Sequence, residues 1–144
     1  MKQLKSIKGV TLLEIMLVLA IAAMVIVMSI RYYQSATLSQ QVNQTMSQIQ
    51  AIAAAADNLA IGSGSYVAAT QAAITAQVGT ANMNSVTGQP IVISNQAASL
   101  YHVDIPVNAA ICESVTAKLV ANKKIVATPC GTHVIYDYDN TQTS

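Results

Sequence analysis

A run of 21 residues, 10–30, constrains this chain most, because it is almost entirely apolar and contains neither Gly nor Pro. At about 1.5 Å per residue, a helix of this length crosses about 30 Å, which is the thickness of the hydrocarbon in a bilayer. A core helix of a soluble domain carries a polar face over such a length. Residues 10–30 are therefore predicted to form a transmembrane helix.

Glu14 is the one charged residue in this run. An ionised carboxylate inside a membrane helix costs about 2.5–3.5 kcal/mol on insertion scales, so another group must compensate it. Glu14 lies four positions after Val10, in the first turn of the expected helix, where the helix dipole favours an acid. The alternative is that the carboxylate extends to the lipid headgroups near the cytoplasmic end of the helix.

Residues 1–9 form a basic leader, with three Lys and no acid, directly before the apolar run. This order is typical of a positively charged segment that stays in the cytoplasm. An ordinary secretory cleavage site would follow the apolar segment, but Ala20, Ala22 and Ala23 lie deep inside it. We therefore expect processing before the run, at Gly9, which joins the leader to the apolar segment.

The composition limits what the rest of the chain can be. With 144 residues, there is room for one small domain besides the membrane segment. Charged residues make up 9% of the chain and the net charge is +1, so the sequence gives no basic surface for binding nucleic acid. The chain has six Tyr but neither Phe nor Trp. Its hydrophobic core therefore consists mainly of aliphatic side chains, and a core this small benefits from additional stabilisation such as a crosslink.

Cys112 and Cys130 are the two cysteines of the chain, with 17 residues between them. A disulfide that closes this loop contributes about 3 kcal/mol. An even number of cysteines in a chain with an export signal favours an oxidising compartment. We expect a Cys112–Cys130 disulfide, and the alternative is a pair of buried free thiols.

Helical spacing of apolar residues continues beyond the membrane run. No Gly or Pro occurs between Val10 and Ile61, and residues 62–65, GSGS, then provide a break. We predict one helix of about 50 residues, with 10–30 in the membrane and 31–61 as its amphipathic continuation. Its apolar positions step by three or four residues: Leu38, Val42, Met46, Ile49, Ala53, Ala56 and Ala60.

Residues 62–144 are predicted to form a small α/β head. Short helices are expected over Val67–Val78 and Ala109–Ala121, with Asn108 as the N-cap of the second, and residues 79–88 are expected to form a loop. Four segments have strand patterns: Pro90–Ser94, Ser99–Ile105, Lys124–Thr128 and His133–Tyr138. The predicted fold class is α+β, with a long N-terminal helix packed on a small, mainly antiparallel sheet with inserted short helices.

No group of residues in the sequence predicts catalysis. His102 and His133 lie on strand faces without further ligands at zinc spacing, and Asp104 near His102 has no nucleophile motif to accompany it. Near the C-terminus, Asp137, Asp139 and Asn140 have side-chain oxygens that could bind calcium. These lack the EF-hand pattern and are more often solvated turn residues. We expect no enzymatic activity, no metal and no cofactor.

The segment Lys8–Glu14, KGVTLLE, followed by the unbroken apolar run, resembles the class III signal of type IV prepilins. The resemblance implies that a prepilin peptidase cleaves between Gly9 and Val10 on the cytoplasmic side and methylates Val10. Glu14 then becomes the fifth mature residue, which pairs with the N-terminal ammonium of its own chain or of a neighbouring subunit. The family implies the neighbour, as a contact that sets register during assembly.

Further segments are similar to the bundle-forming subgroup of type IVb pilins. Arg31–Ala36, RYYQSA, is similar to that subgroup, and Asn58–Ile74 is similar in layout to its helix exit and following short helix. Ala109–Leu119 resembles the cysteine-bearing helix of type IVb pilins. The family calls the segment between such cysteines the D-region, so the resemblance implies a disulfide-bounded C-terminal region.

The resemblance implies a structural role, as a major pilin that polymerises through its N-terminal helix into a surface filament. Such filaments serve adhesion, aggregation, motility, conjugation or DNA uptake. The implied partners are further copies of the chain, the prepilin peptidase, and an assembly platform in the inner membrane, where the precursor resides before the mature form joins an extracellular pilus. Two alternatives remain: a pseudopilin of a type II secretion system, which commonly has a calcium loop in place of the disulfide, and a single-pass membrane protein that never assembles.

Overall fold

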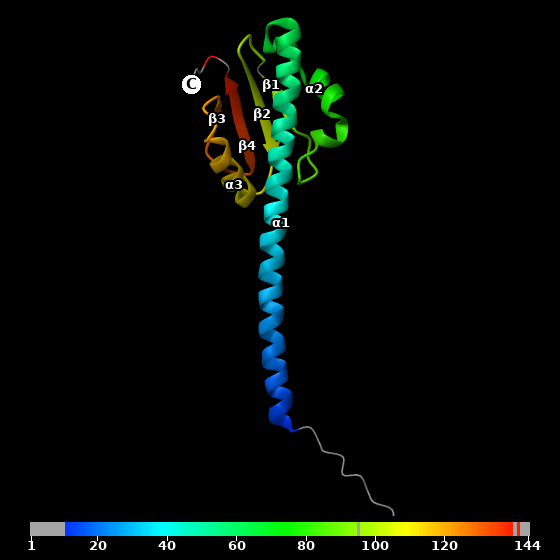
Figure 1. Cartoon of the computed structure of the whole chain (residues 1–144), viewed down its shortest axis with the longest axis vertical. Helices are drawn as coiled ribbons and strands as arrows, with labels where there is room; N and C mark the ends of the chain where they lie inside the picture. Colours follow the sequence, from blue (N-terminus) through cyan, green and yellow to red (C-terminus); the bar gives the residue numbers. More distant parts are fainter. Residues whose placement is uncertain (1–10, 95, 140, 142–144) are drawn as a thin grey trace, which may run out of the picture. The chain divides into compact units, whose positions relative to one another are not determined.

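A computed structural model describes residues 11–94, 96–139 and 141 of the chain. The predicted leader, residues 1–9, lies outside the described residues. The chain divides into two compact units, Met1–Thr37 and Leu38–Ser144. One helix, α1 (Leu12–Ser63), contributes to both units (Figure 1). The cluster of buried apolar side chains that forms the core belongs to the second unit.

The prediction of one long N-terminal helix is confirmed, since α1 has 52 residues. At its start, the Thr11 hydroxyl accepts a hydrogen bond from the Glu14 backbone N–H, at 3.3 Å, and so caps the helix. At its end, Gly64 adopts a φ of 75°, and its N–H donates to the Ala60 carbonyl at 2.6 Å. That left-handed conformation suits glycine, which explains why the helix ends within the GSGS segment.

The second unit contains a four-stranded antiparallel sheet in the order β1-β2-β4-β3. Its strands are β1 (Val92–Ser94), β2 (Leu100–Pro106), β3 (Ile125–Ala127) and β4 (His133–Asp139). The two long strands, β2 and β4, pair along their whole length at the centre. The α+β fold class is therefore confirmed, with the long helix packed on a small antiparallel sheet.

The core forms between one face of the sheet and α1. Side chains alternate along β2 and β4, so that every second residue is buried. Tyr101 on β2 faces Tyr138 on β4, and Val103 faces Tyr136. From α1, the buried residues repeat at helical spacing over the second unit: Val42, Thr45, Gln48, Ile49, Ile52, Ala55 and Ala56. The predicted stripe differs in part. Three of its positions are buried, Val42, Ile49 and Ala56, and the other four are half-buried: Leu38, Met46, Ala53 and Ala60. Four buried residues were not in the predicted stripe: Thr45, Gln48, Ile52 and Ala55.

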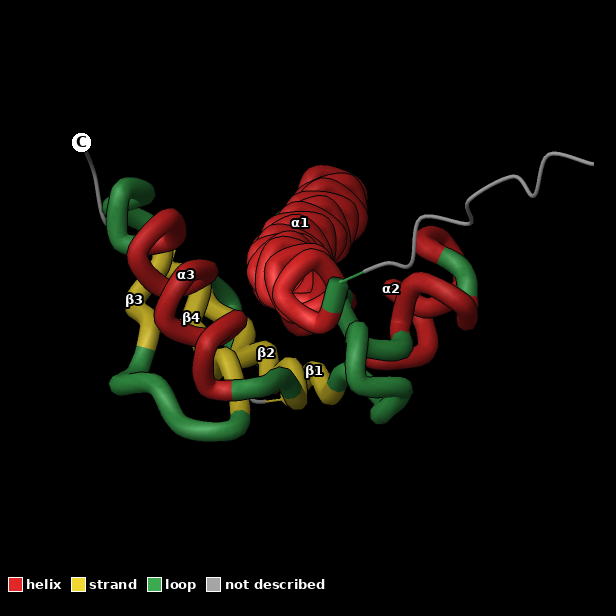
Figure 2. The backbone as a smooth tube through the Cα atoms, turned by 90° about the horizontal axis from the view of Figure 1, so that it is seen from below, coloured by secondary structure: helices red, strands yellow, loops and turns green. Residues whose placement is uncertain are grey.

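Two shorter helices flank α1 in the second unit. Figure 2 shows α3 (Ala109–Leu119) beside β3 and β4, and α2 (Gln71–Val78) beside β1. Gln71 on α2 also forms hydrogen bonds with the backbone at the β1 edge of the sheet. Its side-chain amide accepts from the Ile93 N–H at 2.7 Å and donates to the Ile91 carbonyl at 2.9 Å. A side chain thus takes the place of a neighbouring strand at this edge.

Several predicted boundaries were wrong. The single helix expected over 67–78 is two elements, a 3₁₀ turn at Tyr66–Ala68 and then α2. The chain breaks at Thr70, whose extended backbone and side chain cap α2 by accepting from the Ala73 N–H at 3.3 Å. A second 3₁₀ turn, Thr80–Met83, lies within the segment that was expected to be loop. Asn108 does occupy the N-cap position of α3, but its side chain makes no capping hydrogen bond.

Candidate functional site

The first unit presents a continuous apolar surface. Each of residues 11–36 is exposed, and the large apolar side chains between Leu12 and Ile30 are 50–77% exposed. Within the described residues, this part of α1 is long and apolar enough to cross a membrane. Apolar surface of this extent is not stable in water and needs lipid or other protein to cover it. The N-terminal helix thus indicates membrane association or secretion.

Glu14 lies on this exposed apolar surface, in the first turn of α1. Its backbone N–H bonds to Thr11, at 3.0 Å to the carbonyl and 3.3 Å to the hydroxyl. Among the described residues, no group donates a hydrogen bond to its carboxylate or forms an ion pair with it. The carboxylate is therefore available to a partner. The predicted processing residues, Gly9 and Val10, lie outside the described residues.

The expected disulfide joins Cys112 and Cys130, with Cα atoms 5.7 Å apart. Cys112 is buried on α3, and Cys130 is exposed in the connection between β3 and β4. The Cys112 sulfur also lies 3.2 Å from the His133 carbonyl oxygen at the start of β4. The bridge therefore ties α3 to the connection that leads into the central strand β4, as the sequence predicted.

The two histidines form separate pairs with acids on the outer face of the sheet. His102 Nδ1 lies 2.6 Å from Asp137 Oδ1, directly across from it on β4. His133 Nδ1 lies 2.7 Å from Asp104 Oδ1. Asp104 thus pairs with His133 and not with His102, its neighbour in the sequence. All four side chains are half-buried, and they link β2 to β4 as cross-strand pairs do.

The acids considered for calcium have other partners. Asp137 contacts His102, and Asp139 accepts two hydrogen bonds from Thr141, at 2.8 Å from the backbone N–H and 2.6 Å from the hydroxyl. These hydrogen bonds lower the pKa of Asp139. Asn140 lies outside the described residues. Within the part of the chain that the structure describes, no group of three or more His, Cys, Asp or Glu side chains is placed to hold a metal ion.

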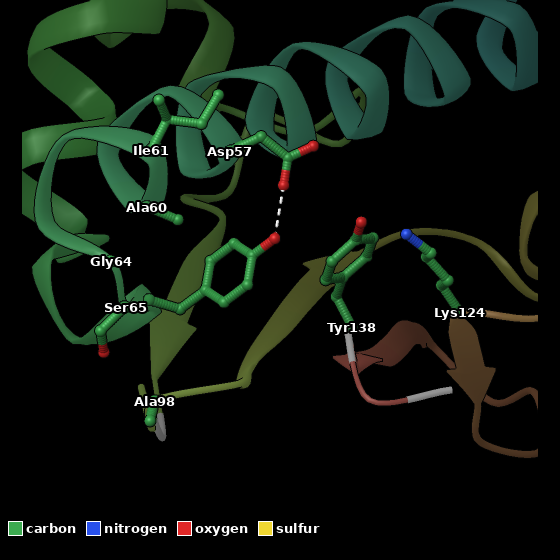
Figure 3. Close-up of a pocket in the computed structure, with 9 residues that line it drawn as sticks. Asp57, Ala60, Ile61, Gly64, Ser65, Ala98, Lys124 and Tyr138 are labelled. Atoms are coloured by element: carbon green, nitrogen blue, oxygen red, sulfur yellow. Dashed lines mark hydrogen bonds between the residues drawn. The ribbon is translucent and has the colours of Figure 1, made fainter. Parts of the chain in front are cut away.

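A polar pocket of about 390 Å³ opens at the end of α1 in the second unit. Four segments that are separate in the sequence line it: residues 57–66 at the end of α1 and in the turn after it, Ala98 before β2, Lys124 before β3, and Tyr138 near the end of β4. Figure 3 shows Asp57 among the residues that line this pocket, and the dashed line at its carboxylate marks the hydrogen bond that it accepts from the Tyr66 hydroxyl. The tertiary fold, rather than any local motif, creates this site.

Asp57 is held in place by Tyr66, which donates its hydroxyl proton to Asp57 Oδ1 at 2.6 Å. Burial, followed by the hydrogen bond and the negative charge of Asp57, raises the pKa of Tyr66 above its usual range. Tyr66 therefore remains a proton donor at all physiological pH values. Its ring packs against Tyr101 and Tyr138, with ring centroids 5.4 and 5.7 Å away.

Sequence reasoning missed both the helix cap at Thr11 and the polar pocket. The cap had a readable signal, since Thr11 and Glu14 have the Thr-x-x-Glu spacing of a capping box. The pocket had none, because its lining comes from separate segments of the chain that only the tertiary fold brings together. Comparison of the chain with protein families, with curated proteins and with solved structures finds no match.

Proposed function

We propose that this chain is a type IV prepilin of the type IVb, bundle-forming kind, and that its mature form is the major subunit of a surface filament. The architecture is pilin-like, with a long apolar N-terminal helix, a four-stranded antiparallel sheet and a disulfide in the C-terminal region. This role is structural, without catalysis. The filament serves adhesion, aggregation, motility, conjugation or DNA uptake.

The exposed apolar half of α1 is the observation that carries this proposal. In the precursor, lipid of the inner membrane covers it. In the filament, the same side chains pack on copies of themselves. Both environments remove the apolar surface from water, so one helix serves as anchor and as polymerisation surface. The assembly platform moves the subunit from one to the other after the peptidase has removed residues 1–9.

Glu14 gives this packing its register. Its carboxylate has no partner among the described residues, and moving it into a filament core without one is costly. The N-terminal ammonium of Val10 in a neighbouring subunit is the proposed partner. Because a buried ion pair roughly offsets its own desolvation, the contact disfavours misaligned subunits more than it strengthens aligned ones.

N-terminal mass analysis of filaments sheared from the cell surface tests the proposal most directly. We expect the subunit in the filaments to begin at methylated Val10. Filaments whose subunits begin at Met1, or cells whose surface fraction lacks the chain altogether, would contradict it. The second outcome, with the chain retained in the membrane, would favour the single-pass protein that never assembles.

A matched pair of acid substitutions tests the role of Glu14. Glu14→Gln is expected to leave the amount of membrane-inserted precursor unchanged and to abolish filaments. Glu113→Gln, on the exposed surface of α3, is the control and should assemble normally. Equal filament yields from the two variants would rule out Glu14 as the register contact.

Thermal melts with and without calcium test the pseudopilin alternative. If the chain is a pseudopilin, calcium is expected to raise its melting temperature.

A further inference from the structure

Arg31 is the one cation among residues 11–37, and it follows directly after the apolar run of α1. It is exposed on the surface of the first unit. Among the described residues, no hydrogen bond or ion pair engages its guanidinium group. An Arg at the end of a membrane helix extends its charged group into the headgroup layer. Arg31 is therefore available to an anionic partner there.

Two tyrosines follow Arg31 and mark the same level of the helix. Tyr32 and Tyr33 are 79% and 70% exposed. Successive residues of a helix point about 100° apart, so Arg31, Tyr32 and Tyr33 surround α1 at one level. Tyrosine is enriched where the hydrocarbon of a membrane meets the headgroups, because its ring is apolar and its hydroxyl is polar. This level of α1 is thus suited to the headgroup layer.

Arg31 also lies at one end of a groove on the surface of α1. The groove has a volume of about 460 Å³, and its other lining residues are apolar: Ala20, Ala23, Met24, Val27 and Met28. From Ala20 to Arg31 it extends for about 16 Å along the helix. The hydrocarbon of one leaflet is about 15 Å deep, half of a bilayer core of about 30 Å. The groove therefore has the length of an acyl chain in one leaflet, with a cation at the headgroup end.

We propose that this groove binds one anionic phospholipid, of the phosphatidylglycerol class, with an acyl chain along the apolar lining and its phosphate on the Arg31 guanidinium. The inference rests on the proposed membrane-spanning precursor, and the site lies in the leaflet opposite the predicted basic leader. The planar guanidinium donates two parallel hydrogen bonds to a phosphate. A zwitterionic headgroup fits less well, because it brings a cation of its own close to Arg31.

A second copy of the chain is a poorer match for the groove in the membrane. Copies that are inserted in the same direction bring their Arg31 guanidinium groups to the same level, where like charges repel. The groove is also separate from the contact proposed to set register in the filament, since Glu14 does not line it. Lipid binding at Arg31 and pairing of Glu14 are therefore independent.

Quenching of tryptophan fluorescence by brominated lipid tests this proposal, because the chain has no Trp of its own. Met28→Trp places the probe at one side of the groove. Ile26→Trp is the matched control, since it places the probe about 200° around the helix and outside the groove. Both positions are exposed and outside the core, so both variants should fold like the wild type. The full chain is inserted into phosphatidylcholine vesicles with a minor fraction of phosphatidylglycerol, and equal amounts of one lipid or the other are brominated.

Brominated phosphatidylglycerol should quench the Met28→Trp variant more strongly than the same amount of brominated phosphatidylcholine. We expect the anionic lipid to be favoured by about fivefold, which is the effect of one Arg or Lys close to an anionic membrane surface. Arg31→Gln in the same background should remove this preference. Arg31→Lys should keep part of it, because the charge remains without the planar fork. The Ile26→Trp control should show no such preference.

Equal quenching of the Met28→Trp variant by the two lipids would overturn the proposal. An equal preference for the anionic lipid in both Trp variants would also overturn it, because it would show a general attraction to the basic leader. Quenching of the Ile26→Trp variant alone would show that a second copy covers the groove. Absence of quenching in both variants would overturn the membrane-spanning helix of the proposed function, and the lipid site with it.

Discussion

Three tyrosines of the second unit, Tyr66, Tyr101 and Tyr136, differ in whether their hydroxyl groups form a hydrogen bond, and therefore in how those hydroxyls affect stability. The Tyr66 hydroxyl donates to a carboxylate, whereas the Tyr101 and Tyr136 hydroxyls are buried without a partner among the described residues. A hydrogen bond to a charged group stabilises a fold, and a buried hydroxyl without one costs free energy. The three residues share one core but differ in what their hydroxyls contribute.

Tyr66→Phe should therefore destabilise the second unit. We expect the free energy of unfolding to fall by about 1–2 kcal/mol, because the substitution removes a hydrogen bond to a carboxylate and retains the packing of the ring. Urea denaturation followed by circular dichroism measures this change. Tyr32→Phe is the control, since Tyr32 is 79% exposed on the first unit. Similar losses in the two variants would show that the bond to Asp57 contributes little.

Alkaline pH provides a second test at the residue scale. Burial raises the pKa values of Tyr66, Tyr101 and Tyr136 above their usual range, whereas the unfolded chain titrates near pH 10. Folding thus favours the neutral hydroxyls, and this contribution is complete below about pH 10 and is lost as the pH rises further. Tyrosinate absorbance of these residues should increase together with the loss of helical ellipticity. Their ionisation in a chain that stays folded would contradict this expectation.

Among the elements, the helix starts are where the structure departs most from sequence reasoning. Thr70 and Asn108 both precede a helix, and both have an extended backbone. Only Thr70 makes the capping hydrogen bond, although Asn108 was the predicted cap. Residue type predicts the N-cap position, but the side-chain torsion that completes the bond depends on packing around it.

This difference leads to a paired prediction. Thr70→Ala should lower the free energy of unfolding by about 1 kcal/mol, because the Ala73 N–H loses its acceptor. Asn108→Ala should cost less, since no capping bond is lost. Thermal melts of the two variants compare them directly. A larger loss from Asn108→Ala would mean that its side chain contributes in some other way.

The disulfide is the clearest prediction at the scale of connected elements. Replacing Cys112 by Ala and Cys130 by Ser removes a crosslink that closes a loop with 17 residues between the cysteines. The free energy of unfolding should fall by about 3 kcal/mol. Dithiothreitol should destabilise the wild-type chain to a similar extent and leave the double variant unaffected. A wild-type chain that is indifferent to reduction would refute the stabilising role of the bridge.

The long helix, the segments that form strands and the cysteine pair were predictable because each has a local signal: an unbroken apolar run, alternation along a strand, and an even cysteine count. The sequence did not predict the break at Thr70, the hydrogen bonds between the Gln71 side chain and the backbone at β1, or the pairing of Asp104 with His133. Each depends on which segments the tertiary fold brings together. The pocket around Asp57 is the extreme case, because its lining comes from four separate segments of the chain.

At the scale of the whole molecule, the two units differ in whether their apolar side chains are exposed or buried. The first unit exposes its apolar residues, whereas the apolar core lies entirely between Val42 and Tyr138 in the second. The second unit also contains the sheet, the disulfide and the part of α1 that covers the sheet. Its fold therefore uses no buried side chain from residues 11–36.

A chain that begins at Leu38 tests this division. We expect residues 38–144 to be soluble without detergent and to unfold cooperatively, because every core residue is retained and the exposed apolar run is absent. The full chain should partition into the detergent phase of Triton X-114, and the shortened chain into the aqueous phase. A shortened chain that aggregates or lacks a cooperative transition would show that the second unit needs the first in order to fold. Reducing the disulfide of the shortened chain then serves as the control for cooperativity, since it should lower the melting temperature while the protein remains in the aqueous phase.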